Sequence, residues 1–279
     1  MTNASEPTFF RLRVAYPKLG RLKYLGHLEL IHTVEQMVRR AKLPYAVTQG
    51  FSPHMRIAYT SALPVGTSST AEYFDVYLTQ LVPAERALES LQAAAPADLR
   101  PVGATYVELR RPALTAEINV VLYQLEILMN PGCSATDDDL ACVFSGWFEQ
   151  GAEIPYRRGK KVKSLDIRHL LRSCGHTVMP DGRVWLGLDT RCDNDGSLRP
   201  EILVAALDQA LCGLAPGVDE EIVSTGIQQL TMFASYNVER SSQLLCTDEG
   251  EVSHPLGHAL DAPQGSLTAR AQAEALSNL

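Results

Sequence analysis

Residues 49–77 read QGFSPHMRIAYTSALPVGTSSTAEYFDVY, a loop rich in Gly, Ser, Pro and His that leads into two expected strands. Polar and apolar residues alternate along residues 71–78, and this period of two is typical of a strand with one buried face. In the loop, Ser52, His54 and Arg56 place a hydroxyl, an imidazole and a guanidinium at every second position. Such a set suits a phosphate or another anion, so the segment indicates both a sheet and a binding surface.

Around this stretch, the first half of the chain reads as β-α-β-β-α-β, the order of a ferredoxin-like unit. Leu30, Val34 and Met37 recur at spacings of three and four, which predicts a helix that ends before Pro44. Pro83 is suited to the first turn of a second helix. The expected strands are residues 9–16, 56–60, 71–78 and 102–109, and the expected helices are residues 28–41 and 83–94.

The second half repeats this order with an insertion. Its expected strands are residues 118–129, 176–180, 183–189 and 219–233, and its helices are residues 135–150 and 199–212. Asp181-Gly182 is a strong signal for a hairpin turn between two of these strands. The insertion consists of a basic hairpin that turns at Gly159, followed by a short helix within residues 164–174.

The sequence therefore predicts an α+β protein of tandem ferredoxin-like units with antiparallel sheets. The first unit is expected to span residues 9–112, and the second, with the basic hairpin inserted, residues 113–240. Residues 1–8 are expected to form a flexible N-terminus. From about residue 241 small and polar residues dominate, which predicts a disordered tail over residues 241–279.

Composition excludes several classes of protein. The chain has 6 cysteines without a C-x-x-C pair, which predicts free thiols and no iron–sulfur cluster. No motif calls for a metal or another cofactor, so none is expected. The sequence has no run of about 18 apolar residues, so no membrane span is expected, and the N-terminus lacks the pattern of a signal peptide. The expected compartment is the cytoplasm.

Positive charge is concentrated in two segments although the formal net charge is −7. Residues 9–60 hold nine Lys or Arg against two acidic residues, and residues 156–172 hold seven against Asp166 alone. This distribution favours a local positive face on an acidic protein. Two unrelated solvated faces would explain the same pattern.

The candidate ligand-binding or RNA-binding residues come from these segments. They are Arg39, Arg40, Ser52, His54, Arg56, Arg157, Arg158, Lys160, Lys161 and Lys163. For the first two, a stabilising interaction with the helix C-terminus is an equal alternative. No catalytic residue is assigned: His54 and His27 are the only candidates for acid–base chemistry, and neither has an evident partner in the sequence.

Several blocks of this sequence resemble the radical-SAM-linked protein family, whose biochemistry is uncharacterised. They are Tyr24-Leu25-Gly26-His27-Leu28-Glu29-Leu30, Arg39-Arg40-Ala41, Gly50-Phe51-Ser52-Pro53-His54-Met55-Arg56, Ala62-Leu63-Pro64-Val65-Gly66, Ala71-Glu72-Tyr73-Phe74-Asp75, KKVKSLDIRHLL (residues 160–171) and SLRPEILVAAL (residues 197–207). Met55 and Ser52 depart from the family pattern, which usually has Pro and Asn there. The resemblance covers most of residues 9–235.

The resemblance implies a non-catalytic accessory or substrate-binding partner of a radical SAM enzyme, with RNA as a plausible substrate. This chain lacks the three clustered cysteines of such an enzyme. One alternative is a metal-independent endoribonuclease similar to CRISPR repeat-RNA nucleases, and another is a scaffold for protein interaction only. The first hypothesis expects the loop at residues 52–56 and the hairpin at residues 157–163 to converge on one anionic ligand.

Overall fold

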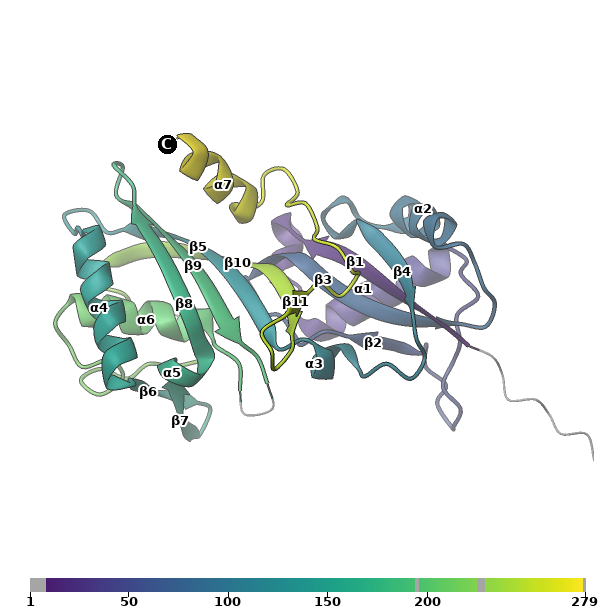
Figure 1. Ribbon diagram of the computed structural model, residues 1–279, viewed down its shortest axis with the longest axis horizontal. Coiled ribbons are helices and arrows are strands. Elements are labelled where there is room, and N and C mark those ends of the chain that lie inside the picture. The colour runs from purple at the N-terminus through teal and green to yellow at the C-terminus, as the bar shows by residue number, and fades with distance from the viewer. Residues whose placement is uncertain (1–8, 194–195, 225–228, 278–279) are drawn as a thin grey trace, which may run out of the picture. The chain divides into compact units, whose positions relative to one another are not determined.

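The computed structural model describes residues 9–193, 196–224 and 229–277 (Figure 1). The chain is an α+β protein with mostly antiparallel strands, and it divides into two compact units. Unit 1 consists of Met1–Asn119 with Ser242–Ser266, and unit 2 consists of Val120–Ser241 with Leu267–Leu279. The boundary lies seven residues after the predicted one, and the C-terminal segment is shared between the units. Among the described helices, none has the length and apolarity needed to cross a bilayer.

Unit 1 is built on an antiparallel sheet. Its strands are β1 (Phe10–Lys18), β2 (Ile57–Tyr59), β3 (Ser68–Leu78) and β4 (Gly103–Val107), and its helices are α1 (His27–Arg40), α2 (Ala84–Ala94) and α3 (Leu114–Glu117), with short 3-10 turns at Gly20–Tyr24 and Ala97–Leu99. The strand order is β4-β1-β3, and β2 pairs with the outer edge of β3. Every one of these pairings is antiparallel.

Helix α1 forms where the spacing of apolar residues predicts it. The Glu29 side chain accepts a hydrogen bond of 2.8 Å from the Gly26 backbone N–H, which satisfies one of the free donors at the helix start. Leu30, Val34, Met37 and Val38 form the buried stripe. The helix ends at Arg40, and Lys42, two residues later, has a left-handed φ of 54° that cannot continue the helical path.

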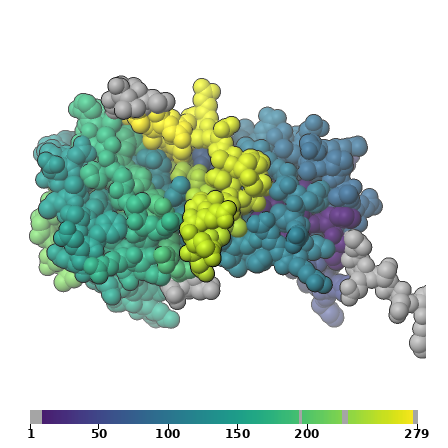
Figure 2. Space-filling model, viewed as in Figure 1, coloured from purple at the N-terminus to yellow at the C-terminus, as the bar shows by residue number. Residues whose placement is uncertain are grey.

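The two faces of the unit 1 sheet are buried in different ways. On one face, side chains of β1 and β3 such as Val14 and Phe74 join the apolar cluster that includes α1 and α2. On the other face lie Arg11, Arg13 and Asp75, all of which are buried. Residues 247–266 contribute to the surface of unit 1 (yellow in Figure 2).

In unit 2, four neighbouring strands lie in one sheet, and a hairpin stands separate from it. Its elements are β5 (Val120–Met129), α4 (Asp137–Gln150), β6 (Glu153–Arg158), β7 (Lys161–Asp166), α5 (Ile167–Leu170), β8 (Leu171–Val178), β9 (Arg183–Arg191), α6 (Pro200–Leu211), β10 (Phe233–Cys246, whose last five residues belong to unit 1) and α7 (Leu267–Ser277). The order is β10-β5-β9-β8, while β6 and β7 form their own two-stranded sheet. The predicted turns at Gly159 and at Asp181-Gly182 are confirmed.

The prediction of a strand over residues 219–233 is wrong, because β10 begins only at Phe233. Part of that range, residues 225–228, lies outside the described residues. Buried Asp208 accepts hydrogen bonds of 2.8–2.9 Å from the backbone N–H groups of Thr231, Met232 and Phe233. These three bonds fix the backbone just where the strand starts, and no local pattern reveals them.

Residues 241–277, expected to be disordered, carry the end of β10, a short strand β11 (Val252–Ser253) and α7. The Gln243 amide donates a hydrogen bond of 2.6 Å to the Ala71 carbonyl, which attaches this part of β10 within unit 1. The carboxylate of Glu239 accepts bonds from the Leu267 and Thr268 backbone N–H groups and thereby caps α7 within unit 2. The expected flexible N-terminus, residues 1–8, lies outside the described residues.

Candidate functional site

Three of the nine basic residues counted in residues 9–60 are buried and cannot belong to a positive surface. Arg11 and Arg13 flank Asp75, and the Lys18 ammonium donates to the carbonyls of Lys23 and Leu25 at 3.2 and 2.8 Å. The count of basic residues in the sequence included these three in a predicted cationic face. Their burial follows from their positions in β1, whose two faces are both covered.

The arginine pair and Asp75 form a buried ionic cluster. The Arg11 Nε and Nη2 atoms donate to Asp75 Oδ2 at 2.9 and 2.7 Å. Arg13 Nε donates to Asp75 Oδ1 at 2.8 Å, and its Nη2 atom lies 2.9 Å from Glu117 Oε2. Arg13 Nη1 also donates to the Pro255 carbonyl. Because all charges are paired, this cluster holds unit 1 together and offers no site for a ligand.

The candidate cations at the end of α1 are solvent-exposed. Arg39 lies 3.4 Å from Glu35, one helical turn away, and its side chain is 51% exposed. Arg40 is exposed as well. The paired arginine is partly neutralised, and both stand in the last helical turn, where cations also stabilise the helix dipole. The structure thus leaves both explanations of these residues in place.

The loop with Ser52 and His54 is the tip of a small hairpin. The Thr48 backbone N–H donates to the His54 carbonyl at 2.8 Å, and the His54 N–H donates to Thr48 Oγ1 at 3.0 Å. Ser52 and His54 are exposed at this tip. Arg56 is exposed as well, and its guanidinium stacks over the Tyr77 ring, 4.1 Å from the centroid. In the described part of the chain, no hydrogen bond or ion pair connects the side chains of the three loop candidates.

His27 lies at the first position of α1, beside a small hollow lined by Tyr16, Tyr59, Thr60 and Glu72 among others. The His27 ring meets the Tyr59 ring edge-on, with 6.2 Å between centroids. Thr60 Oγ1 donates to the buried Glu72 carboxylate at 3.2 Å, and burial raises the pKa of Tyr59 well above its usual value. The hollow has room for about one water molecule, which is too little for a substrate group.

The hairpin β6–β7 is anchored at one side by Arg157. Its Nε and Nη2 atoms donate to the two carboxylate oxygens of Glu221 at 2.6 and 2.8 Å. Its backbone N–H donates to the Ile222 carbonyl, and its own carbonyl accepts from the Ser224 N–H. The hydrogen bonds from Arg157 lower the pKa of Glu221, and the same bonds raise the pKa of Arg157. Arg157 is therefore a structural anchor whose charge is matched within unit 2.

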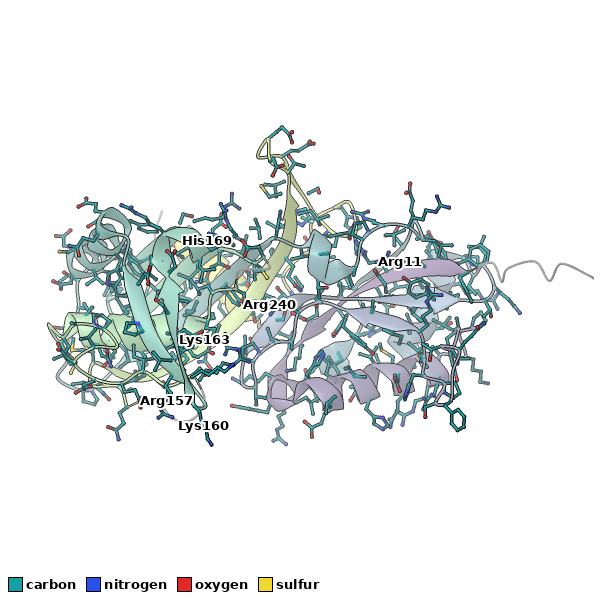
Figure 3. All side chains as sticks on the ribbon, turned by 90° about the horizontal axis from the view of Figure 1, so that it is seen from below. Arg11, Arg157, Lys160, Lys163, His169 and Arg240 are labelled. Atoms are coloured by element: carbon teal, nitrogen blue, oxygen red, sulfur yellow. The ribbon has the colours of Figure 1, made fainter. Side chains whose placement is uncertain are left out.

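The other four cations of the hairpin are exposed. Arg158, Lys160, Lys161 and Lys163 surround the turn at Gly159, which has a φ of 61°. Figure 3 shows Lys160 at the free end of this hairpin. Among the described residues, no acidic side chain forms an ion pair with any of the four. They form what we call the cationic tip: Arg158, Lys160, Lys161 and Lys163.

Strand pairing determines how the cationic tip is presented. Arg158 lies opposite Lys161, and Tyr156 lies opposite Lys163. Directly opposed residues share a face, so Arg158, Lys161 and Lys163 project from the same side of the ribbon. The Cβ atoms of cross-strand neighbours stand about 5 Å apart, so the like charges of Arg158 and Lys161 are close enough to repel each other. An anion bound there would relieve this repulsion.

No cluster of metal ligands accompanies these surfaces within the described residues. The cysteines there are free thiols, and burial raises the pKa of Cys174 to about 12. The loop at residues 52–56 belongs to unit 1 and the cationic tip to unit 2, so each is a surface of its own unit. Their convergence on one ligand stays a prediction.

Comparison with known proteins gives one family and a number of remote solved structures, two of which follow. A family model described as "Uncharacterized protein conserved in bacteria (DUF2344)" matches residues 11–200. No curated protein matches the chain. The crystal structure of a candidate glycine cleavage system transcriptional repressor is similar at 11% identity and a TM-score of 0.23, covering 83% of this chain and 98% of that one. An unknown protein from Galdieria sulphuraria is similar at 10% identity and a TM-score of 0.21, covering 66% and 81%.

Proposed function

This chain belongs to the bacterial family described as uncharacterized (DUF2344), and within that family we propose that it is a non-catalytic RNA-binding accessory protein. The cationic tip of unit 2 binds the phosphate backbone of RNA and presents it to a separate radical SAM enzyme in the cytoplasm. The enzyme partner rests on the sequence resemblance alone. RNA binding rests on the geometry of the hairpin.

One observation carries the RNA proposal: four cations crowd around a two-residue turn, and none has an acidic partner in the described chain. By contrast, the neighbouring Arg157 is matched by Glu221 in a two-bond pair. The four cations at the turn thus remain available to a ligand, although Arg157, directly before Arg158, is neutralised. Each phosphate contact would release a condensed counterion, which favours binding to a polyanion.

We also propose that each unit is ferredoxin-like. In unit 1, the strand order β4-β1-β3 with β2 on the far edge of β3 matches a β-α-β-β-α-β unit, and all neighbours are antiparallel. In unit 2, the order β10-β5-β9-β8 repeats the pattern, with the β6–β7 hairpin and α5 inserted after α4. The insertion that carries the cationic tip is thus an addition to the repeated unit.

Nothing in the geometry favours the nuclease alternative for the described residues. His54 bonds only through its backbone, and His27 borders a hollow with room for about one water molecule. Acid–base cleavage of RNA needs a group within hydrogen-bond reach of the 2′-hydroxyl and a second group near the leaving oxygen. Neither histidine has such a companion beside an open site.

The proposal is tested by charge reversal at the cationic tip. A variant with Arg158, Lys160, Lys161 and Lys163 changed to Glu is compared with one in which four exposed arginines of unit 1 are changed to Glu, namely Arg21, Arg86, Arg100 and Arg110. Both variants change the net charge by the same amount. Affinity for fluorescent single-stranded RNA should be lost in the first and mostly kept in the second. Equal loss in both would mean that only overall charge matters, and would refute the assignment.

An acidic protein is the competing partner for the same four cations. If the wild-type protein retains no RNA but binds an acidic polypeptide such as poly-glutamate, the scaffold alternative replaces the RNA proposal. The proposal is supported if RNA stays bound to the protein in the presence of poly-glutamate at the same concentration of charges.

A further inference from the structure

Helix α7 covers part of the outer face of the unit 2 sheet. Its N-terminus is capped by Glu239, as described above, and Glu274 near its C-terminal end accepts hydrogen bonds from Arg183 Nη1 at 2.9 Å and Trp185 Nε1 at 2.8 Å. The helix is thus tied to strands β9 and β10 at two points. Between these ties and the sheet lies an open cavity of about 250 Å³, which we call the α7 trough.

The floor of the α7 trough is flat. Gly175 on β8 lies directly opposite Gly187 on β9, and Gly187 lies opposite Gln124 on β5. Two facing glycines leave bare backbone where an outer sheet face normally carries side chains. A side-chain carbon at Gly175 would meet no atom within 4 Å, which shows that this space is empty.

The sides of the α7 trough are mixed in character. Trp185 is held in one orientation by its bond to Glu274, and Ala271 and Ala275 of α7 are too small to fill the space. A packed helix–sheet interface normally leaves few voids larger than a water molecule. A cavity of about 150 Å³ is enough to bind a single aromatic ring, so the α7 trough is large enough for a ring system of one or two rings.

Two polar side chains give the α7 trough its recognition chemistry. The Gln124 amide oxygen lies 3.8 Å from where a Gly187 side-chain carbon would stand, so the amide extends over the floor. Within the described residues this amide has no hydrogen-bond partner. Thr177 donates its hydroxyl to the His176 carbonyl at 2.8 Å, which leaves its oxygen free to accept. A Gln amide matches an adjacent donor and acceptor on a nucleobase edge.

We propose that the α7 trough binds one unpaired nucleobase, which lies flat on the glycine floor and bonds its polar edge to Gln124. The inference deepens the proposed function and rests on it: the cationic tip holds the phosphates of RNA, and the α7 trough takes a base. Proteins commonly recognise single-stranded RNA by holding splayed-out bases against flat surfaces, usually aromatic rings or guanidinium planes, and by hydrogen bonds to the base edges.

The test fills the α7 trough without disturbing its surroundings. Gly175→Val adds a strand-forming side chain into empty space, and Ser173→Val makes a similar change on the same face of β8 outside the trough. Gln124→Ala removes the amide without adding volume. Each protein is titrated with the four ribonucleosides to about 1 mM, followed by tryptophan fluorescence, and with single-stranded RNA.

The wild-type protein and Ser173→Val should bind at least one nucleoside saturably, and Gly175→Val should bind it at least about tenfold more weakly. RNA affinity should fall at least about fivefold in Gly175→Val, the lower end of the range for loss of one base stacked on an aromatic ring, with its salt dependence unchanged. Gln124→Ala should alter the preference among nucleosides. No nucleoside binding by the wild-type protein, or equal binding by Gly175→Val, overturns the inference while leaving RNA binding by the cationic tip intact. Nucleoside binding without any RNA binding overturns the proposed function and leaves the α7 trough as a site for free bases.

Discussion

Replacing Asp75 by Asn should strongly destabilise unit 1. Asp75 is fully buried and accepts charge-assisted bonds from Arg11 and Arg13, which are 2% and 0% exposed. The Asn side chain keeps the shape of Asp and one acceptor oxygen, but it removes the negative charge. The two guanidiniums then face each other with only Glu117 to balance them.

The magnitude follows from the cost of leaving a buried charge unmatched. Removing one partner of a buried ion pair costs about 3–5 kcal/mol. For a domain of this size, each kcal/mol lowers the melting temperature by about 2–4 °C, so Asp75→Asn should lower it by about 6–20 °C. Glu35→Gln is the matched control, since it also neutralises one carboxylate beside an arginine. Its pair with Arg39 is exposed, and the expected cost is about 0–1 kcal/mol.

Urea unfolding followed by circular dichroism measures both variants against the wild-type protein. Hydrogen exchange of the β1 and β3 amides assigns the transition to unit 1, because the two units need not unfold together. A loss below about 1 kcal/mol for Asp75→Asn would refute the reasoning, since it would mean that water or a rearranged partner compensates the buried arginines.

Three further outcomes are expected. Burial raises the pKa of Cys174 to about 12, so this thiol should react with iodoacetamide at pH 8 far more slowly than exposed Cys142. Mass spectrometry of the modified peptides measures both rates, and equal rates would contradict the burial of Cys174. Glu239→Gln should weaken the cap of α7, so limited trypsin digestion should cut after Arg270 faster than in the wild-type protein, and unchanged cutting would show that other contacts hold the helix. The protein purified from its native cell should retain a radical SAM protein even after nuclease treatment, and the absence of such a protein in repeated purifications would remove the enzyme partner from the proposal.

The sequence predicted elements whose signals are local. The stripe of Leu30, Val34 and Met37 defined α1, and the glycines of the turns at residues 159 and 182 marked two hairpins, because only glycine takes positive φ there without strain. The α+β class and the antiparallel sheet followed from the same alternation of residues. In each case a few neighbouring residues determine the structure.

What the sequence could not predict depends on partners far along the chain. Arg11 and Arg13 look like surface cations, and only the position of Asp75 more than 60 residues later shows that they are buried. Composition also misjudged residues 241–277, because the Gln243 bond to Ala71 and the Glu239 cap are long-range contacts. A polar composition favours disorder only when no distant residue forms hydrogen bonds with the segment.

In the candidate site, too, local signals were predicted from the sequence and long-range contacts were not. The cationic tip was found from its run of like charges, but the pairing of Arg157 with Glu221 removed one member from the predicted set. Arg56 stays a candidate for anion binding, and its stacking on Tyr77 is a contact that the sequence did not reveal. The α7 trough was missed altogether: Gly175, Gly187 and Gln124 lie on three strands, and their spacing in the sequence gives no sign that they are neighbours.

The salt dependence of RNA affinity tests the central claim most directly. If Arg158, Lys160, Lys161 and Lys163 each contact one phosphate, they contribute a slope of about −3 to the plot of log affinity against log salt concentration, from about 0.7 per contact with a single strand. The four-site Glu variant should lose that slope, and the unit 1 arginine variant should keep it. A wild-type affinity that does not change with salt, or the same slope in all three proteins, would contradict the assignment of RNA binding to the β6–β7 hairpin.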